Sequence, residues 1–365
     1  MNKPYIWEHN GWPYLSWDNK ELSPLLGEIR NRQGVLTGKV SLLGDELKRR
    51  TLHNMVVTEI MASTRIEGKR LDEEAVTAAT RRYLAKNRFR LSETGDSSVG
   101  ATQVFIDALF NYNQTITSER LFLWKYAFEG RTDYDRSEMG WIEADSMLGL
   151  AVRKPVERKM EYLKIPVPED TATEMKTFLT WLNTIHPTDP VIKAGVAFLR
   201  FLLIRPFEQD NGRIARNIAT MFLLRADNLP ELFFSMSAQI ENDRHQYNDI
   251  LFHTQTASTD ITEWLRWYLY CVGGALTHAE AALLHTLNKS RFFDKYRLFS
   301  LNERQLHTLN LLWDGFDGKL TTTVYGSINK CSQDTALRDI QDLIAKNILR
   351  KEYAGGRSTA YKLIV

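Results

Sequence analysis

One proline constrains the fold of this chain more than any other residue. Pro206 follows a long apolar run, 190–203, and precedes a polar loop, after which a second periodic run begins at Asn211. Proline has no backbone N–H and clashes with the preceding turn, so it ends the first helix. The segment therefore predicts two helices joined by a short polar loop.

The second of these helices carries positive charge where a helix disfavours it. Polar side chains recur along it at helical spacing: Arg213, Arg216, Asn217 and Thr220. Two arginines near the helix start lie at the positive end of the dipole, which is unfavourable by itself. The placement becomes favourable where an anion binds, because the free amides and the dipole attract negative charge. A solvated face or internal ion pairs are the alternative interpretation.

Helical periodicity covers most of the chain, so the sequence predicts a mostly α-helical protein. Residues 46–86 indicate two helices, the second of which begins near Leu71 with acids in its first turn. Further helices are expected over 101–112, 118–128, 173–183, 190–203, 213–227, 242–253 and 262–290. Residues 87–98 are polar and are expected to form a loop.

Two segments depart from the helical pattern. Residues 147–152 and 160–165 indicate a β-hairpin, and 153–159, which contains Pro155, is its expected turn. The C-terminal part indicates three helices followed by two strands, over 303–313, 322–330, 333–346, 348–352 and 360–364. That order is typical of a winged helix-turn-helix.

A chain of 365 residues is long enough for two or three domains. We expect an N-terminal region over 1–95, a helical core domain over 96–290 and a winged helix domain over 300–365. The composition of the chain is ordinary for a globular protein.

Charge and cysteine content exclude several classes. Lys plus Arg is 47 and Asp plus Glu is 45, so the net charge of +2 gives no chain-wide attraction to nucleic acid or anionic membrane. Cys271 and Cys331 are too few for a disulfide scaffold or a structural zinc site. The first residues lack the apolar core of a signal peptide, and the most apolar stretch, 196–204, is far shorter than the about 20 residues of a membrane span. We expect a cytoplasmic protein.

The loop and the second helix resemble the signature of Fic (Fido) family proteins, His-Pro-Phe-x-(Asp/Glu)-Gly-Asn-Gly-Arg-x-x-Arg. Six fixed positions match at the family's spacing: Pro206, Phe207, Asn211, Gly212, Arg213 and Arg216. Residues 63–68, Ser-Thr-Arg-Ile-Glu-Gly, resemble the family's inhibitory motif, (Ser/Thr)-x-x-x-Glu-(Gly/Asn). The position of this motif before the core matches the class with an N-terminal inhibitory helix, so the motif assigns Ser63, Glu67 and Gly68 to inhibition.

Other segments extend the resemblance over nearly the whole chain. The hairpin 147–165 takes the place of the family's target-docking flap, and 260–265 resembles the helix that follows the core. The Trp-rich residues 1–40 and the winged helix fit one bacterial subgroup. The resemblance therefore implies a Fic-type helical core with a β-hairpin flap and a C-terminal winged helix.

The resemblance implies AMP transfer from ATP to a Ser, Thr or Tyr hydroxyl of a target protein docked at the flap. In the family a His takes the hydroxyl proton, and Mg²⁺ on an acidic residue neutralises the phosphates. Asn211, Gly212, Arg213 and Arg216 would hold the nucleotide at the helix start. Tyr247 lies where the family often has an aromatic near the adenine, although core packing explains it equally well. Relatives often form homodimers.

Three residues depart from the signature. Arg205 takes the place of the catalytic His, and a guanidinium cannot act as a base near neutral pH. Gln209 takes the place of the metal ligand, and its neutral amide makes Mg²⁺ binding doubtful. Asp210 adds a charge and a Cβ where the family has a glycine. Loss of the base alone costs about 3–5 kcal/mol, so AMP transfer by the usual route should be absent or very slow.

Three hypotheses follow from these motifs. The protein is a pseudo-enzyme that acts by binding a nucleotide or a target protein. Alternatively, it is an AMP transferase or a de-AMPylase held off by Glu67, which the resemblance pairs with Arg216 at the site of the ATP γ-phosphate. As a third alternative, it is a regulator that binds DNA through the winged helix.

The charges of the winged helix support DNA binding only weakly. Its third helix carries two basic and three acidic residues: Arg338, Lys346, Asp334, Asp339 and Asp342. That is a poor electrostatic footprint for phosphate. Arg350, Lys351 and Arg357, on and between the two strands, are better candidates for a phosphate contact.

Overall fold

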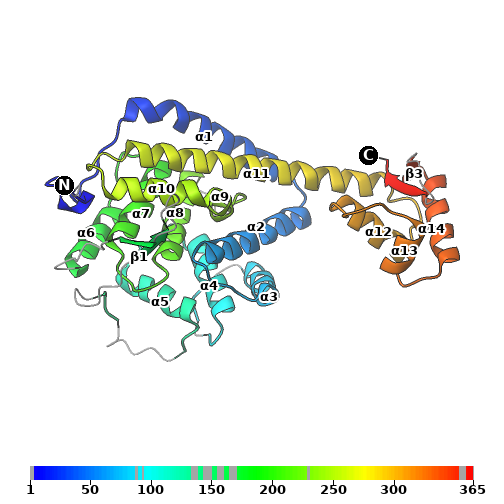
Figure 1. The fold of residues 1–365 in the computed structure, drawn as a ribbon, viewed down its shortest axis with the longest axis horizontal. Helices are drawn as coiled ribbons and strands as arrows, with labels where there is room; N and C mark the ends of the chain where they lie inside the picture. The colour runs from blue at the N-terminus through cyan, green and yellow to red at the C-terminus, as the bar shows by residue number, and fades with distance from the viewer. Residues whose placement is uncertain are drawn as a thin grey trace. The chain divides into compact units, whose positions relative to one another are not determined.

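The computed structural model (Figure 1) divides into two compact units, Met1–Ala281 and Ala282–Val365. It describes the following residues: 4–86, 89–92, 94–132, 139–142, 150–153, 160–163, 171–227, 231–352 and 359–364. Among these residues every helix is too short or too polar to cross a lipid bilayer. The mostly helical fold expected from the sequence is confirmed.

The first unit consists almost wholly of helices. They are η1 (Ile6–Glu8), α1 (Asn19–Ser41), α2 (Asp45–Ile66), α3 (Glu73–Leu84), α4 (Ser97–Phe110), α5 (Ser118–Glu129), α6 (Thr171–Asn183), α7 (Pro190–Ile204), α8 (Asn211–Asp227), α9 (Met236–Asn242), α10 (Arg244–Gln255) and α11 (Thr262–Lys295). The boundary between the two units falls within α11. Helix α1 is fixed to the first part of α11 by Arg32, which donates to the carbonyl of Gly273 and to the hydroxyl of Thr277.

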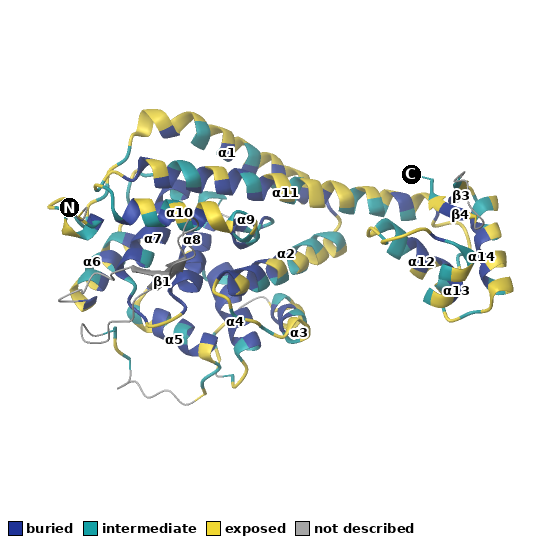
Figure 2. Ribbon diagram, viewed as in Figure 1, coloured by how far each residue is buried: buried dark blue, intermediate teal, exposed yellow. Residues whose placement is uncertain are grey.

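Helices α7 and α8 form the centre of this unit, and Figure 2 shows both as buried along most of their length. Asp189 caps α7 by accepting from the amide of Val191, and Pro190 occupies the first turn, where its missing N–H is harmless. Gly195 allows α11 to approach closely, because a Cβ there would lie 2.7 Å from a ring carbon of Tyr268. The buried α7–α8 pair therefore provides a rigid base for the loop between them.

The predicted β-hairpin is present in its described part. Strand β1 (Leu150–Arg153) pairs antiparallel with β2 (Met160–Leu163), and Leu150 is opposite Leu163. Residues 147–149, 154–159 and 164–165 of the predicted hairpin, including Pro155, lie outside the described residues.

Two helix boundaries differ from the sequence prediction. Helix α4 begins at Ser97, inside the expected loop, because Asp96 caps it by accepting from two backbone amides. The helix expected over 242–253 is α10, which begins two residues later, and an additional short helix that the sequence did not predict, α9, ends just before it at Asn242. Ser235 caps α9 by accepting from the amide of Ala238. This helix has seven residues, which is too few for helical periodicity to show in the sequence.

The second unit has its own core and the element order predicted from the sequence. Its elements are α12 (Glu303–Trp313), α13 (Thr322–Ile328), α14 (Gln333–Ala345), β3 (Leu349–Glu352) and β4 (Ala360–Leu363). The two strands pair antiparallel, and Leu320 forms a bridge to Tyr361 of β4. The core gathers apolar side chains from every one of these elements.

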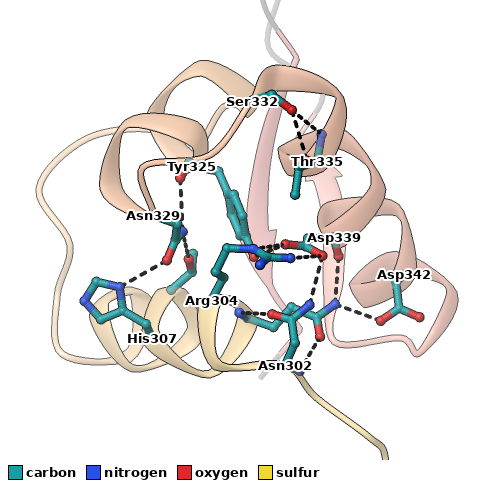
Figure 3. A network of polar contacts seen from close by, with 11 residues as sticks. Asn302, Arg304, His307, Tyr325, Asn329, Ser332, Thr335, Asp339 and Asp342 are labelled. Atoms are coloured by element: carbon teal, nitrogen blue, oxygen red, sulfur yellow. Dashed lines mark hydrogen bonds and ion pairs between the residues drawn. The ribbon is translucent and has the colours of Figure 1, made fainter.

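A polar network joins the three helices of this unit (Figure 3). Asp339 of α14 accepts from the Arg304 Nε at 2.8 Å, the Asn302 Nδ2 at 2.9 Å and the Tyr325 hydroxyl at 3.1 Å. We refer to these four residues as the Asp339 network. Burial tends to raise the pKa of Asp339, but the hydrogen bonds from Arg304, Asn302 and Tyr325 outweigh it and lower this pKa below its usual value.

The Asp339 network and one ion pair reduce the negative charge on the outer face of α14. Asp339 is turned inward, and Asp342 is paired with Lys346 at 2.5 Å. These two acids therefore do not oppose a phosphate on the outer face of the helix. Asp334 and Arg338 are exposed there, so that face is close to neutral.

Candidate functional site

The loop between α7 and α8 is held rigidly at both of its ends. Arg205 caps α7 in the left-handed conformation, with φ 50° and ψ 60°, and donates its amide to the carbonyl of Phe201. Asn211 fixes Phe207 through both backbone groups, accepting from its N–H at 3.1 Å and donating to its carbonyl at 2.5 Å. The Phe207 ring is buried against Trp141, with centroids 5.3 Å apart. The loop therefore presents Arg205 and the start of α8 in one defined geometry.

The polar stripe of α8 is buried rather than solvated. Arg213 is 2% exposed and Arg216 is 3% exposed, and Asn217 and Thr220 are also buried. The solvated-face interpretation is therefore wrong, because helices distant in the sequence pack over this stripe. What remains is a buried cluster of arginines that must find anionic partners.

Arg216 finds its partners on the last turn of α2. Its Nε donates to the Ser63 hydroxyl at 2.9 Å, and its Nη2 donates to the Ser63 carbonyl at 2.8 Å and to the Glu67 carboxylate at 2.9 Å. The pair between Glu67 and Arg216 predicted from the sequence is thus present. The Nη1 of Arg216 is buried and has no hydrogen-bond partner among the described residues.

The Glu67 carboxylate also lies against the first turn of α8. A Cβ at Gly212 would lie 2.1 Å from the Glu67 Oε1, so only glycine admits the carboxylate here. The dipole and free amides of a helix start favour an anion at this position. In this conformation the chain itself supplies the negative charge, through the internal ion pair that the sequence left open as the alternative to a bound anion.

Asp210 supplies a second carboxylate to the same helix start. Its φ of 62° is left-handed, which costs a non-glycine residue about 1–2 kcal/mol. Its Oδ1 pairs with the Arg213 Nη1 at 3.1 Å, and its Oδ2 pairs with the Lys69 Nζ at 2.8 Å. The two ion pairs explain how an aspartate is accommodated where the family has a glycine.

Sequence reasoning missed three of the residues that hold the end of α2 and the loop after it in place. Besides Lys69, Arg65 forms a bidentate pair with Glu241 at 2.6 and 2.8 Å, and Arg244 donates to the carbonyl of Ile66 at 2.6 Å. The clustering of Arg65 and Lys69 around the motif was the available signal. The partner of Arg65 lies in α9, that of Lys69 lies in the loop before α8, and Arg244 itself belongs to α10. No local pattern in the sequence connects these segments with residues 63–69.

Burial is the largest cause of the shifts in the pKa of Arg213 and Arg205. Burial lowers the pKa of Arg213, and the Asp210 carboxylate partly restores it. Burial likewise lowers the pKa of Arg205, while the charge of Glu67 raises it. A guanidinium stays charged at neutral pH under such shifts, so Arg205 remains a cation.

The residues present do not fit a Mg²⁺ ion. Glu208 and Gln209 are exposed, and Gln209 offers only a neutral amide oxygen. Asp210 is already shared between two cations, which compete with a metal for its oxygens. Within the described part of the chain, no group of three or more His, Cys, Asp or Glu side chains could hold a metal ion.

Tyr247 lies in the packed interior beside the site. Its ring stacks on Phe198, with centroids 6.1 Å apart, and lies 5.6 Å from the ring of Trp267. Burial raises the pKa of its hydroxyl well above the usual value. These contacts agree with a packing role, and the predicted adenine contact stays a prediction.

Comparison with known proteins bears on this region directly. Residues 135–223 match the model of the Fic/DOC family, and residues 5–85 match that of a domain of unknown function, DUF4172. The chain is 31% identical over 108 residues to the protein adenylyltransferase Fic of Nematostella vectensis. That match covers 29% of this chain and 23% of the other protein, so the chain aligns with about a quarter of that relative.

The fold has a counterpart among solved structures. A Fic family protein from Desulfovibrio desulfuricans G20 superimposes with a TM-score of 0.53 at 17% identity, covering 96% of this chain and 98% of the other. At that identity the likeness speaks for the fold alone. Together these matches show that the chain carries a Fic/DOC family domain within a mostly helical Fic fold.

Proposed function

We propose that this protein is a Fic protein that does not transfer AMP by the family's usual route and acts instead by binding a nucleotide or a target protein. One observation carries the proposal. Arg205, which cannot accept a proton at neutral pH, occupies the position where the family's base is expected. Loss of a general base costs about 3–5 kcal/mol of transition-state stabilisation, and the poor fit to Mg²⁺ adds to that loss.

The contacts of Glu67 support a second part of the proposal, that this conformation is an inhibited one. The Glu67 carboxylate occupies the start of α8 and pairs with Arg216, the arginine that the resemblance assigns to the ATP γ-phosphate. ATP would bind once Glu67 moves away. A target protein would dock along the hairpin 147–165, as the resemblance implies.

The rival interpretation is an enzyme that Glu67 alone holds off. In that case removal of the Glu67 carboxylate would release AMP transfer, or Glu67 itself would activate water for AMP removal. Both reactions normally use the catalytic His, and Arg205 cannot take that role.

Label transfer from α-labelled ATP separates these interpretations. The proteins to compare are the wild type, Glu67→Gly, Arg205→His, and a combined variant with Glu67→Gly, Arg205→His, Gln209→Asp and Asp210→Gly. We expect label on the protein or on a partner only with the combined variant. Label transfer by Glu67→Gly alone would contradict the proposal and assign a working role to Arg205.

The second unit supports an additional candidate function, nucleic-acid binding through a winged helix. Arg350 and Lys362 are exposed and lie directly opposite each other on β3 and β4. Like charges in that position are destabilising unless an anion lies near them, and Glu352 compensates only Lys362, at 3.3 Å. Binding to duplex DNA that weakens steeply with salt would support this candidate, provided that Arg350→Gln reduces the salt dependence. Salt-independent or absent binding would rule it out.

A further inference from the structure

Positive charge exceeds negative charge at the start of α8. Six charged residues meet there, and we refer to them as the α8 cluster: Lys69, Arg205, Arg213, Arg216, Glu67 and Asp210. Four of them are cations and two are carboxylates, so the cluster carries an excess of two positive charges. That excess equals the charge of one Mg²⁺ ion.

Each carboxylate of the cluster holds one arginine of α8. Glu67 pairs with Arg216 and Asp210 pairs with Arg213, and the two arginines lie three residues apart on the same face of the helix. The buried Nη1 of Arg216 has no partner in the described part of the chain, although it lies 3.1 Å from the position of a Cβ on Gly212. This nitrogen of Arg216, near the start of α8, can therefore donate to an additional acceptor.

Each carboxylate has a second cation nearby if another anion replaces it on its arginine. Asp210 can keep its contact with Lys69, whose side chain is 37% exposed, while it releases Arg213. Glu67 is 27% exposed at the end of α2 and already interacts electrostatically with Arg205. The arginines can thus change partners without leaving either carboxylate buried and unpaired.

We propose that the α8 cluster binds a diphosphate group, such as that of a nucleoside diphosphate, without a divalent metal. The two phosphates replace Glu67 on Arg216 and Asp210 on Arg213, and Arg205 and Lys69 supply the charge that a metal ion would otherwise bring. Arginine suits this role because its planar, permanently charged fork matches phosphate oxygens. The inference rests on the proposed function, in which this site binds rather than transfers.

Calorimetric titration of ADP into the full chain tests this inference, in EDTA and again in excess Mg²⁺. Wild type and Glu67→Gly are compared, because loss of one competing carboxylate should tighten binding by about tenfold. We expect Glu67→Gly to bind ADP in EDTA, with an affinity that Mg²⁺ changes by less than about twofold. Binding that requires Mg²⁺, or no binding in either buffer, would overturn the inference.

Variants in the Glu67→Gly background assign the charge to particular residues. Arg205→Gln should weaken ADP binding in EDTA by about tenfold, and Arg205→Lys, which keeps the charge, should stay within about threefold. The exposed Arg49→Gln is the matched control and should change nothing. Equal loss in Arg205→Gln and Arg205→Lys, with unchanged melting temperatures, would contradict an electrostatic role for Arg205.

Two further arms separate related explanations. In the Glu67→Gly background, Asp210→Gly should tighten ADP binding in EDTA, because it removes the carboxylate that competes for Arg213. Weaker binding in that variant would contradict our account of the cluster. Inorganic pyrophosphate that binds as tightly as ADP would show that the diphosphate alone is recognised. AMP transfer by the wild type would refute the proposed function yet leave metal-free binding intact, whereas absent ADP binding would refute only this inference.

Discussion

The α8 cluster and the Asp339 network both join arginine to buried carboxylate, and they differ in how completely the charges are satisfied. In the Asp339 network three donors converge on one carboxylate, and none of its four residues has a positive φ. In the α8 cluster the cations outnumber the carboxylates, one arginine nitrogen lacks a partner in the described structure, and Arg205 and Asp210 are both left-handed.

The difference distinguishes a structural network from a binding site. A balanced network satisfies every group at once and gains nothing from a ligand. An excess of charge on strained backbone persists only where the surrounding packing imposes it, and such places cluster at ligand sites. The comparison supports our proposal that the α8 cluster binds an anion, whereas the Asp339 network contributes to stability.

The largest expected effect comes from Gly212→Ala. The added methyl group overlaps the Glu67 carboxylate, so the variant should lose about 2 kcal/mol of unfolding free energy in urea. In the Glu67→Gly background the same change should be neutral or stabilising, because alanine favours a helix over glycine by about 1 kcal/mol. Equal losses in both backgrounds would show that Gly212 is needed for some reason other than Glu67.

A somewhat smaller effect is expected from Asp339→Ala. Three donors would lose their acceptor, and the second unit should lose about 1.5 kcal/mol of stability in urea denaturation. Gln341→Ala, an exposed change on the same helix, is the control and should have little effect. Asp339→Ala should leave ADP binding unchanged, and weaker ADP binding in this variant would break the distinction between the two regions.

The smallest expected effect is a loss of stability of the second unit at acidic pH. The pKa of Asp339 is lowered by its hydrogen bonds despite burial, and that of Asp342 is lowered chiefly by its hydrogen bond with Lys346. A lowered pKa gives stability that is present above the carboxyl's unfolded pKa of about 3.9 and is lost as pH falls through the folded value. The second unit should therefore weaken below about pH 4, and Asp339→Asn should flatten that dependence in thermal melts. A melting temperature of the second unit that is constant from pH 5 to about pH 3 would contradict this predicted loss of stability.

The elements with strong local signals could be predicted from the sequence. Pro206 ended α7, Asn211 began α8, and the second unit follows the predicted order of three helices and two strands. The resemblance also predicted the pair between Glu67 and Arg216. In each case a few neighbouring residues, or one family motif, carried the information.

Long-range contacts account for what the sequence could not provide. Lys69 and Asp210 are 141 residues apart, and nothing local indicates that they meet. The burial of Arg213 depends on helices packed over α8, and Asp339 faces inward because Arg304 and Tyr325 lie on other helices. Helical spacing assigns a residue to a face of its own helix, but only packing decides whether that face meets water.

Titration of ADP into Glu67→Gly in EDTA tests most directly whether the excess positive charge of the α8 cluster, which the Asp339 network lacks, binds an anion. Our account predicts saturable binding with one ADP per chain and no requirement for metal, because Arg205 and Lys69 provide the missing charge. Binding that appears only after Mg²⁺ is added would contradict it, and would mean that the excess of positive charge at α8 serves the closed conformation alone.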